Sequence, residues 1–190
     1  MGKIVVSENV TLDGIVQDPT GEEGLDGGGW FGRVGEKNIE AWGKIAYDEA
    51  RHAEALLFGR RSYEWFAKKW TSRSGEFADR LATLPKYVVS STMEDPRWNN
   101  STVLKGDVVS QVSKLKQSRE GEIVLYASSQ LVHALLKHDL VDELRLTIYP
   151  FVIGVGERLF GATSDTTSLR LVETRNIGDS LVYLRYDIAR

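Results

Sequence analysis

Small and hydroxyl residues stand where an apolar segment meets the start of a helical pattern. Ala127, Ser128 and Ser129 follow the apolar residues 123–126, and apolar residues one helical turn apart begin at Leu131. In parallel α/β proteins such a junction binds phosphate groups, because the N–H groups at a helix N-terminus are free. The alternative is a tight turn with no ligand, and the spacing alone leaves both interpretations open.

A second junction of this kind carries positive charge. The apolar segment 55–58 ends at Gly59, and Arg60, Arg61 and Ser62 open the next helical pattern. Two guanidinium groups together with free backbone N–H groups can bind a phosphate. A solvated basic turn with Ser62 as a helix cap is the alternative.

Hydroxyl groups follow a third apolar segment, and a carboxylate follows the first one. The first segment, with Ile4, Val5 and Val6 as its apolar centre, is predicted to be a strand over Lys3 to Glu8. Ser90, Ser91 and Thr92 end another strand pattern, where they could meet a ligand or form an ordinary turn. Asp13 precedes Gly14, so it either belongs to a turn or points a carboxylate into a site.

The sequence lacks the motifs of several enzyme classes. It has three histidines without the H-E-x-x-H spacing, no cysteine, no cluster of carboxylates, no P-loop and no G-x-S-x-G segment. A metal site is therefore not expected. No nucleophile stands beside an obvious base, so an enzyme with this sequence would depend on a bound cofactor.

The elements that must position these residues alternate along the chain. Residues 123–126, the helical pattern after them and the alternating residues 144–149 form a βαβ unit. Shorter units of the same kind precede it, and alternating apolar residues at 168–174 and 181–188 form a terminal hairpin. We therefore predict an α/β fold with a mostly parallel central sheet, flanking helices and an antiparallel C-terminal hairpin, in one domain over residues 1–190.

Composition narrows the class further. The 190 residues are 42% hydrophobic and 27% charged, which is typical of a globular domain. A net charge of -3 argues against a protein that binds nucleic acid or a membrane surface. We expect a cytoplasmic protein, because cysteine is absent and no signal peptide or run of membrane-spanning length is found.

Residues 17–35 form a long connection with seven glycines and four acidic residues. Loops of this length are uncommon in compact domains unless they are functional or disordered. Trp30 and Phe31 lie near its end. These aromatic side chains either belong to a lid over a site or fix the loop to the core.

Four segments together resemble a known family. SENVTLDG, LLFGRRSYE, KYVVSST and LVDELRLTIYPFVIGVGERLF are similar, in this order, to the dihydrofolate reductase-like group that includes the C-terminal reductase domain of bacterial riboflavin biosynthesis. The resemblance covers Lys3 to Tyr186. It implies a dihydrofolate reductase-like fold with an NADPH site along the C-terminal edge of the sheet.

The resemblance also assigns roles to residues of this chain. The residues that would hold the phosphates are Gly59, Arg60, Arg61, Ser62, Ala127, Ser128, Ser129, Gln130 and Leu131. Those that would meet the adenosine ribose and its 2′-phosphate are Ser90, Ser91 and Thr92. Those that would border the nicotinamide are Asp13, Gly14 and Ile15. The substrate would lie between Trp30 and Phe31 on one side and, on the other, Pro150, Val152 and Gly154.

Two positions depart from the family pattern. Ala127 stands where the family usually has glycine, which changes the turn beside the pyrophosphate. Dihydrofolate reductases also use a carboxylate on the first helix to protonate the pterin. The nearest acids here, Glu40 and Asp48, fall at other helical positions.

The sequence thus predicts an NADPH-dependent reductase that transfers hydride to a small heterocyclic or carbonyl substrate, pteridine- or pyrimidine-like. Asp13, or a water that it holds, is the expected proton donor. The alternative is a non-catalytic protein that binds a nucleotide or pterin on the same scaffold. The apolar terminal hairpin leaves a sheet edge that needs covering, and the family resemblance supports pairing there, so we expect a homodimer.

Overall fold

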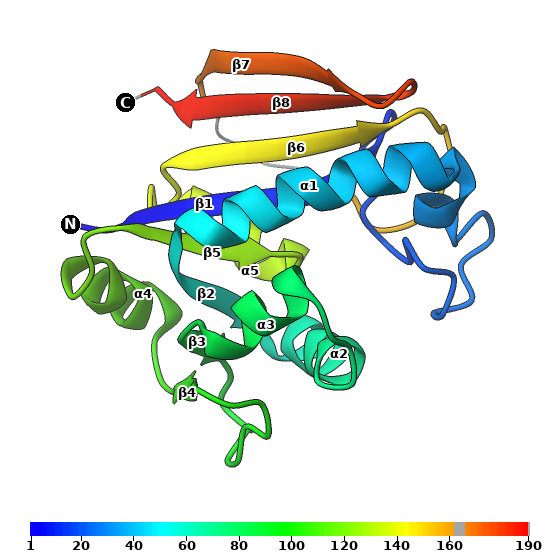
Figure 1. Cartoon of the computed structure of the whole chain (residues 1–190). Coiled ribbons are helices and arrows are strands. Elements are labelled where there is room, and N and C mark those ends of the chain that lie inside the picture. The colour runs from blue at the N-terminus through cyan, green and yellow to red at the C-terminus, as the bar shows by residue number, and fades with distance from the viewer. Residues whose placement is uncertain (162–165, 190) are drawn as a thin grey trace.

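One sheet runs through the computed structural model, which describes residues 1–161 and 166–189 (Figure 1). Its eight strands lie in the order β4-β3-β2-β5-β1-β6-β8-β7. From β4 to β6 in this order, every pair of adjacent strands is parallel. Strand β8 then pairs antiparallel with β6, and β7 pairs antiparallel with β8. The predicted α/β fold is confirmed. The strands are β1 Lys3–Thr11, β2 Ala53–Gly59, β3 Lys86–Val89, β4 Ser101–Leu104, β5 Glu122–Tyr126, β6 Glu143–Tyr149, β7 Leu169–Ile177 and β8 Leu181–Ile188.

Helices cover both faces of the sheet (Figure 1). Leu115 of α4 and Leu131 of α5 belong to the core on one face, and Tyr63 of α2 and Leu81 of α3 to the core on the other. Helix α1 covers this second face through Ala50. No helix in the described part of the chain is long and apolar enough to cross a membrane. The helices are η1 Trp30–Val34 (3₁₀), α1 Glu36–His52, α2 Arg60–Trp70, α3 Glu76–Thr83, α4 Val108–Gln117 and α5 Ser129–Lys137.

Strand β1 continues past the end of its neighbour β5. The pairing of β1 with β5 ends at Ser7 and Tyr126, whereas its pairing with β6 continues to Thr11 and Tyr149. The sequence predicted a strand that stops at Glu8, so the observed strand is three residues longer. Beyond Ser7, β1 has β6 beside it but not β5. Open α/β sheets bind ligands at such a C-terminal edge.

Strand β7 forms the outer edge of the sheet (Figure 1). Its apolar side chains Leu169, Leu171 and Val172 are 39%, 51% and 46% exposed. At its other end the hairpin packs through Ile177 against a small core that contains Trp30. The hairpin is therefore fixed to the domain at its turn and exposes apolar surface along its edge strand.

Candidate functional site

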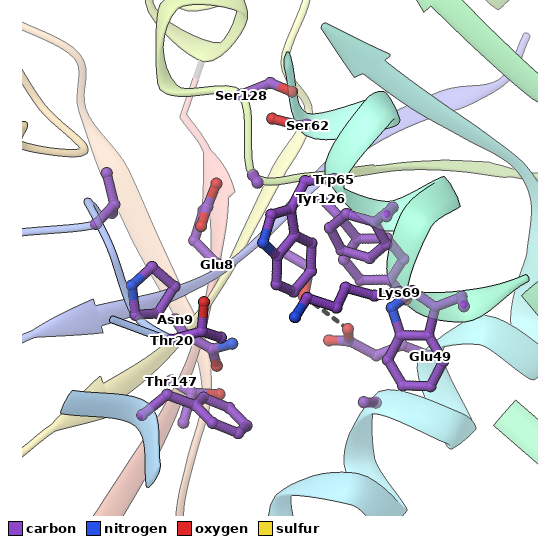
Figure 2. A pocket seen from close by; sticks show the side chains of 18 of the residues that line it. Glu8, Asn9, Thr20, Glu49, Ser62, Trp65, Lys69, Tyr126, Ser128 and Thr147 are labelled. Carbon is purple, nitrogen blue, oxygen red and sulfur yellow. Dashed lines mark hydrogen bonds between the residues drawn. The ribbon is translucent and has the colours of Figure 1, made fainter. Parts of the chain in front are cut away.

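A cavity of about 1290 Å³ opens at the C-terminal edge of the sheet (Figure 2). It lies among the end of β1, helix α1, the start of α2, the β5–α5 junction and the loop after β1. An aromatic wall opposite polar groups suits a planar ligand that also forms hydrogen bonds. The aromatic lining residues are Phe31, Trp42, Tyr47, Trp65, Phe66, Trp70, Phe77 and Tyr126. The polar and charged residues on the strands and on α1 are Ser7, Glu8, Asn9, Glu40, Lys44, Glu49 and Thr147.

Glu8 is a buried acid in the wall of this cavity. Its residue exposure is 9%, and its Oε1 atom has no hydrogen-bond partner in the described structure. Burial, followed by the nearby charge of Glu157, raises the pKa of Glu8 to about 8. The carboxyl group therefore holds its proton at neutral pH. The described residues contain no group of three or more metal-ligating side chains.

A second buried carboxyl group enters the cavity from α1. Glu49 accepts hydrogen bonds from Ser7 Oγ at 2.7 Å and from the Tyr183 hydroxyl at 3.3 Å. Burial raises the pKa of Glu49. The sequence had pointed to Glu40 and Asp48 as the nearest acids of this helix, but both are exposed. Glu40 lies in the cavity lining as an exposed side chain and Asp48 lies outside it, so the buried carboxyl group that α1 presents to the cavity is that of Glu49.

The two predicted phosphate-binding junctions meet at one end of the cavity. Ser128 Oγ accepts a hydrogen bond from the Gly59 backbone N–H at 2.9 Å. Helices α2 and α5 have neither a side-chain cap nor an acid in the first turn. The other three α-helices begin with acids in the first turn or with the Asp107 cap. Free N–H groups and two positive dipole ends therefore face the same region. The junction residues that line the cavity are Gly59, Arg60, Arg61, Ser62, Ala127, Ser128, Ser129, Gln130 and Leu131.

The turn before α5 uses a left-handed backbone. Ala127 and Ser128 have φ angles of 53° and 71°. Residues other than glycine adopt this conformation at a cost in free energy, which is the consequence of having Ala127 in place of glycine. Ser129 follows, and its Oγ donates a hydrogen bond to Glu157 Oε1 at 2.7 Å.

The residues assigned to the adenosine end lie beside the main cavity. Arg60 Nη1 donates a hydrogen bond to Thr92 Oγ1 at 2.6 Å, and both residues border a second hollow of about 800 Å³ on the other side of α2. Ser90 is buried, and its Oγ accepts a hydrogen bond from the Met93 N–H. Ser91 is exposed. Arg60 therefore connects the two hollows, whereas the three hydroxyl residues do not line the larger one.

Asp13, the expected proton donor, lies outside the cavity lining. Its carboxylate accepts hydrogen bonds from Thr11 Oγ1 at 2.6 Å and from the N–H groups of Ile153 and Gly154 at 3.1 and 2.7 Å. These hydrogen bonds, with that from Thr11 foremost, lower the pKa of Asp13. An ionised carboxylate that fastens one loop to another is a poor proton donor. Gly14 and Ile15, which were also expected to border the nicotinamide, lie outside the cavity lining as well.

The aromatic residues of the long loop have different positions. Trp30 is fully buried, its Nε1 donates a hydrogen bond to the Gln17 carbonyl at 3.0 Å, and its ring packs edge-on against Tyr149. Phe31 lines the cavity and packs against Trp42. Trp30 therefore fixes the loop to the core, and Phe31 reaches the site. The three residues expected on the substrate side lie outside the lining: Pro150, Val152 and Gly154.

The architecture is that of a dihydrofolate reductase-like protein. The dihydrofolate reductase of Enterococcus faecalis, solved with NADP(H), has a TM-score of 0.58 over 99% of this chain and 97% of that chain, at 15% identity. A Shewanella sp. PV-4 protein assigned to riboflavin biosynthesis has a TM-score of 0.77 over 99% of each chain, at 24% identity. These likenesses establish the fold.

Within this class the sequence defines one family. The RibD C-terminal domain profile matches residues 2–183, and the chain belongs to that family. The protein YyaP of Bacillus subtilis (strain 168) is 25% identical over 189 residues, which cover 97% of this chain and 94% of that protein. The resemblance predicted from the four segments is confirmed, and the chain has the fold of a reductase family.

Proposed function

We propose that this protein is an NADPH-dependent reductase of a small heterocyclic or carbonyl substrate. The observation that carries the proposal is Glu8, a buried carboxyl in the cavity wall with an unpartnered oxygen. Hydride addition to a C=N or C=O bond leaves negative charge on the heteroatom, which then takes up a proton. With a pKa of about 8, Glu8 holds that proton at neutral pH and can donate it. In this role Glu8 replaces Asp13.

The residues around the cavity fit the charged parts of NADPH, which when bound supplies the hydride. The uncapped N-termini of α2 and α5 offer N–H groups to the pyrophosphate. Arg60 and Thr92, already joined by a hydrogen bond, offer a guanidinium group and a hydroxyl to the 2′-phosphate. The family and the fold support the same cofactor.

The opposite half of the cavity suits a planar substrate. Trp65 and Phe66 of α2 and Trp42 of α1 form flat apolar walls. The Tyr126 hydroxyl is buried and has no hydrogen-bond partner among the residues that the structure describes, and its ring stacks on Phe66 with centroids 5.8 Å apart. This hydroxyl and the carboxyl group of Glu49 can bind the polar edge of a ring, since buried polar groups favour hydrogen-bonded partners. A pteridine- or pyrimidine-like heterocycle is therefore favoured over an aliphatic carbonyl compound.

One observation favours the alternative of a non-catalytic binding protein. The Gly59 N–H already donates to Ser128 Oγ, and the Ser129 hydroxyl already donates to Glu157. Two groups assigned to the pyrophosphate thus have intramolecular partners. A heterocycle bound by the aromatic wall alone would need neither of them.

The test combines binding with turnover. Quenching of tryptophan fluorescence measures NADPH binding, and loss of absorbance at 340 nm measures its oxidation with pteridine, pyrimidine and carbonyl compounds. We expect Glu8→Gln to lower kcat about 100-fold or more, while NADPH affinity changes little. Asp48→Asn, which removes a carboxylate outside the cavity lining, is the matched control. Binding of NADPH without oxidation would favour the non-catalytic alternative, and no binding would refute the reductase.

A further inference from the structure

The loop after β1 has a compact tip, defined here as residues 18–29. The Asp18 carboxylate, in a residue only 2% exposed, accepts hydrogen bonds from the N–H groups of Glu23 and Leu25, both at 3.0 Å. The ends of the tip meet where the Gly29 N–H donates to the Asp18 carbonyl at 2.9 Å. Gly28 packs so closely that a Cβ atom there would lie 2.3 Å from the Asp18 carboxylate. The tip is therefore a preformed unit that can move as one body.

Two acidic side chains join this tip to α2. Glu22 pairs with Lys69 and accepts a hydrogen bond from Trp65 Nε1 at 3.3 Å, and Glu23 lies 3.9 Å from the Arg61 guanidinium. Arg61, Trp65 and Lys69 are spaced four residues apart, so they share one face of α2, and this face lines the cavity. Among the residues that the structure describes, the hydrogen bonds and ion pairs between the tip and α2 are all made by Glu22 and Glu23.

The tip and α2 contribute facing parts of the cavity wall. Thr20 of the tip lies on one side of the cavity, and Trp65 and Lys69 lie on the other (Figure 2). The side chains of Glu22 and Lys69 are 41% and 25% exposed, and those of Glu23 and Arg61 are 43% and 74% exposed. Ion pairs at such exposed positions are weak and reversible. The contact can therefore join the tip to α2 across the cavity and still be broken by a competing ligand.

We propose that Glu22 and Glu23 form an autoinhibitory latch, in which they occupy Arg61 and Lys69 until an anionic ligand competes for these two basic side chains. The ligand has phosphate groups, because a carboxylate and a phosphate bind a guanidinium or ammonium group in the same way. The latch rests on the proposed function in that NADPH is the ligand expected to release it.

The first measurement is the rate of NADPH association, followed by stopped-flow tryptophan fluorescence. We expect about fivefold faster association for the double variant Glu22→Gln/Glu23→Gln, as the loss of two weak ion pairs allows. Asp26→Asn is the matched control, because Asp26 is an exposed acid of the same tip and its substitution removes one charge without breaking a contact to α2. Equal rates for the wild type and the double variant, or the same gain in Asp26→Asn, would overturn the latch.

The second measurement does not depend on turnover or on NADPH. The chain has no native cysteine, so Asp26→Cys carries a single fluorophore at the tip. We expect its anisotropy to fall when Glu22 and Glu23 are replaced, and also when pyrophosphate is added to the otherwise unchanged protein. Unchanged anisotropy in both cases would overturn the latch. A fall in both cases without NADPH binding would support the latch and refute the reductase.

Discussion

Gly59 and Ser128 lie 69 residues apart in the sequence and are joined by a hydrogen bond of 2.9 Å. The contact is close, because a Cβ atom on Gly59 would lie 3.3 Å from Ser128 Oγ. Ser128 reaches this position from a left-handed turn that it shares with Ala127. The N-termini of α2 and α5 are thereby held in one arrangement, and the turn at residues 127–128 is strained to maintain it.

The first prediction concerns this strain. Ala127→Gly should raise the free energy of unfolding by about 0.5 to 1 kcal/mol, because glycine adopts a φ of 53° without steric cost. By the same reasoning it should tighten NADPH binding by about 1 kcal/mol, since the methyl group beside the expected pyrophosphate site is removed. Urea denaturation and NADPH titration measure the two effects.

Ser128→Gly is the control for this prediction. It also relieves a left-handed residue, with a φ of 71°, but it removes the hydrogen bond to Gly59. Its gain in stability should therefore be smaller than that of Ala127→Gly, or absent. An unfolding free energy that falls in Ala127→Gly would contradict the argument.

The second prediction concerns the pH dependence of stability. The pKa of Glu8 is about 8 in the folded protein, above the ordinary value of 4.5 that it regains on unfolding. The folded state thus binds the proton more tightly, and its stability falls as the pH rises from about 5 to 8. We expect this fall to amount to about 2 to 4 kcal/mol from Glu8 alone.

Glu8→Gln isolates this contribution. The variant cannot ionise at position 8, so its stability relative to the wild type should increase steadily between pH 5 and pH 8. Glu157→Gln should reduce the pH dependence in part, because the Glu157 charge is the second cause of the raised pKa. Parallel pH profiles for the wild type and Glu8→Gln would show that Glu8 titrates normally.

The junctions at Gly59 and Ala127 could be predicted from the sequence because their chemistry is local. Each junction is an apolar segment followed by small or basic residues. Because the C-terminal ends of parallel strands lie at one edge of a sheet, both junctions were expected at that edge. The contact between them could not be predicted, since it depends on a turn with two left-handed residues.

The buried acids Glu8 and Glu49 were not predicted as site residues from the sequence. Glu8 follows the apolar residues of β1, and a charged residue there was taken as the end of the strand, although β1 continues beside β6. Glu49 adjoins Ala50 on the apolar stripe of α1, which was a usable signal. The Asp13 carboxylate is bound by N–H groups 140 and 141 residues away, and no local pattern indicates such partners.

The third prediction concerns cofactor choice. NADPH should bind at least about 10-fold tighter than NADH, a difference of about 1.4 kcal/mol, because Arg60 and Thr92 offer charge and a hydroxyl to the 2′-phosphate. Arg60→Met should remove most of this preference and leave NADH affinity nearly unchanged. Lys114→Met on α4, a charge removal outside both hollows, should alter neither affinity. Equal affinities of the wild type for the two cofactors would refute the assignment.

The last prediction is a homodimer formed through β7. Charges on this edge strand are satisfied within the chain, since Arg170 pairs with Asp187 and Arg175 pairs with Glu173.

Beside these paired charges β7 exposes the apolar side chains of Leu169, Leu171 and Val172, and an exposed apolar edge strand is a ready site for pairing with a second strand. Leu171→Lys places a charge at the centre of this edge and should convert the dimer to a 21.3 kDa species in sedimentation at micromolar concentration. Leu12→Lys changes a leucine that is 68% exposed elsewhere, so it should leave the dimer intact and serves as the control. A wild-type protein that already sediments at 21.3 kDa would show that β7 is covered in some other way or tolerates exposure.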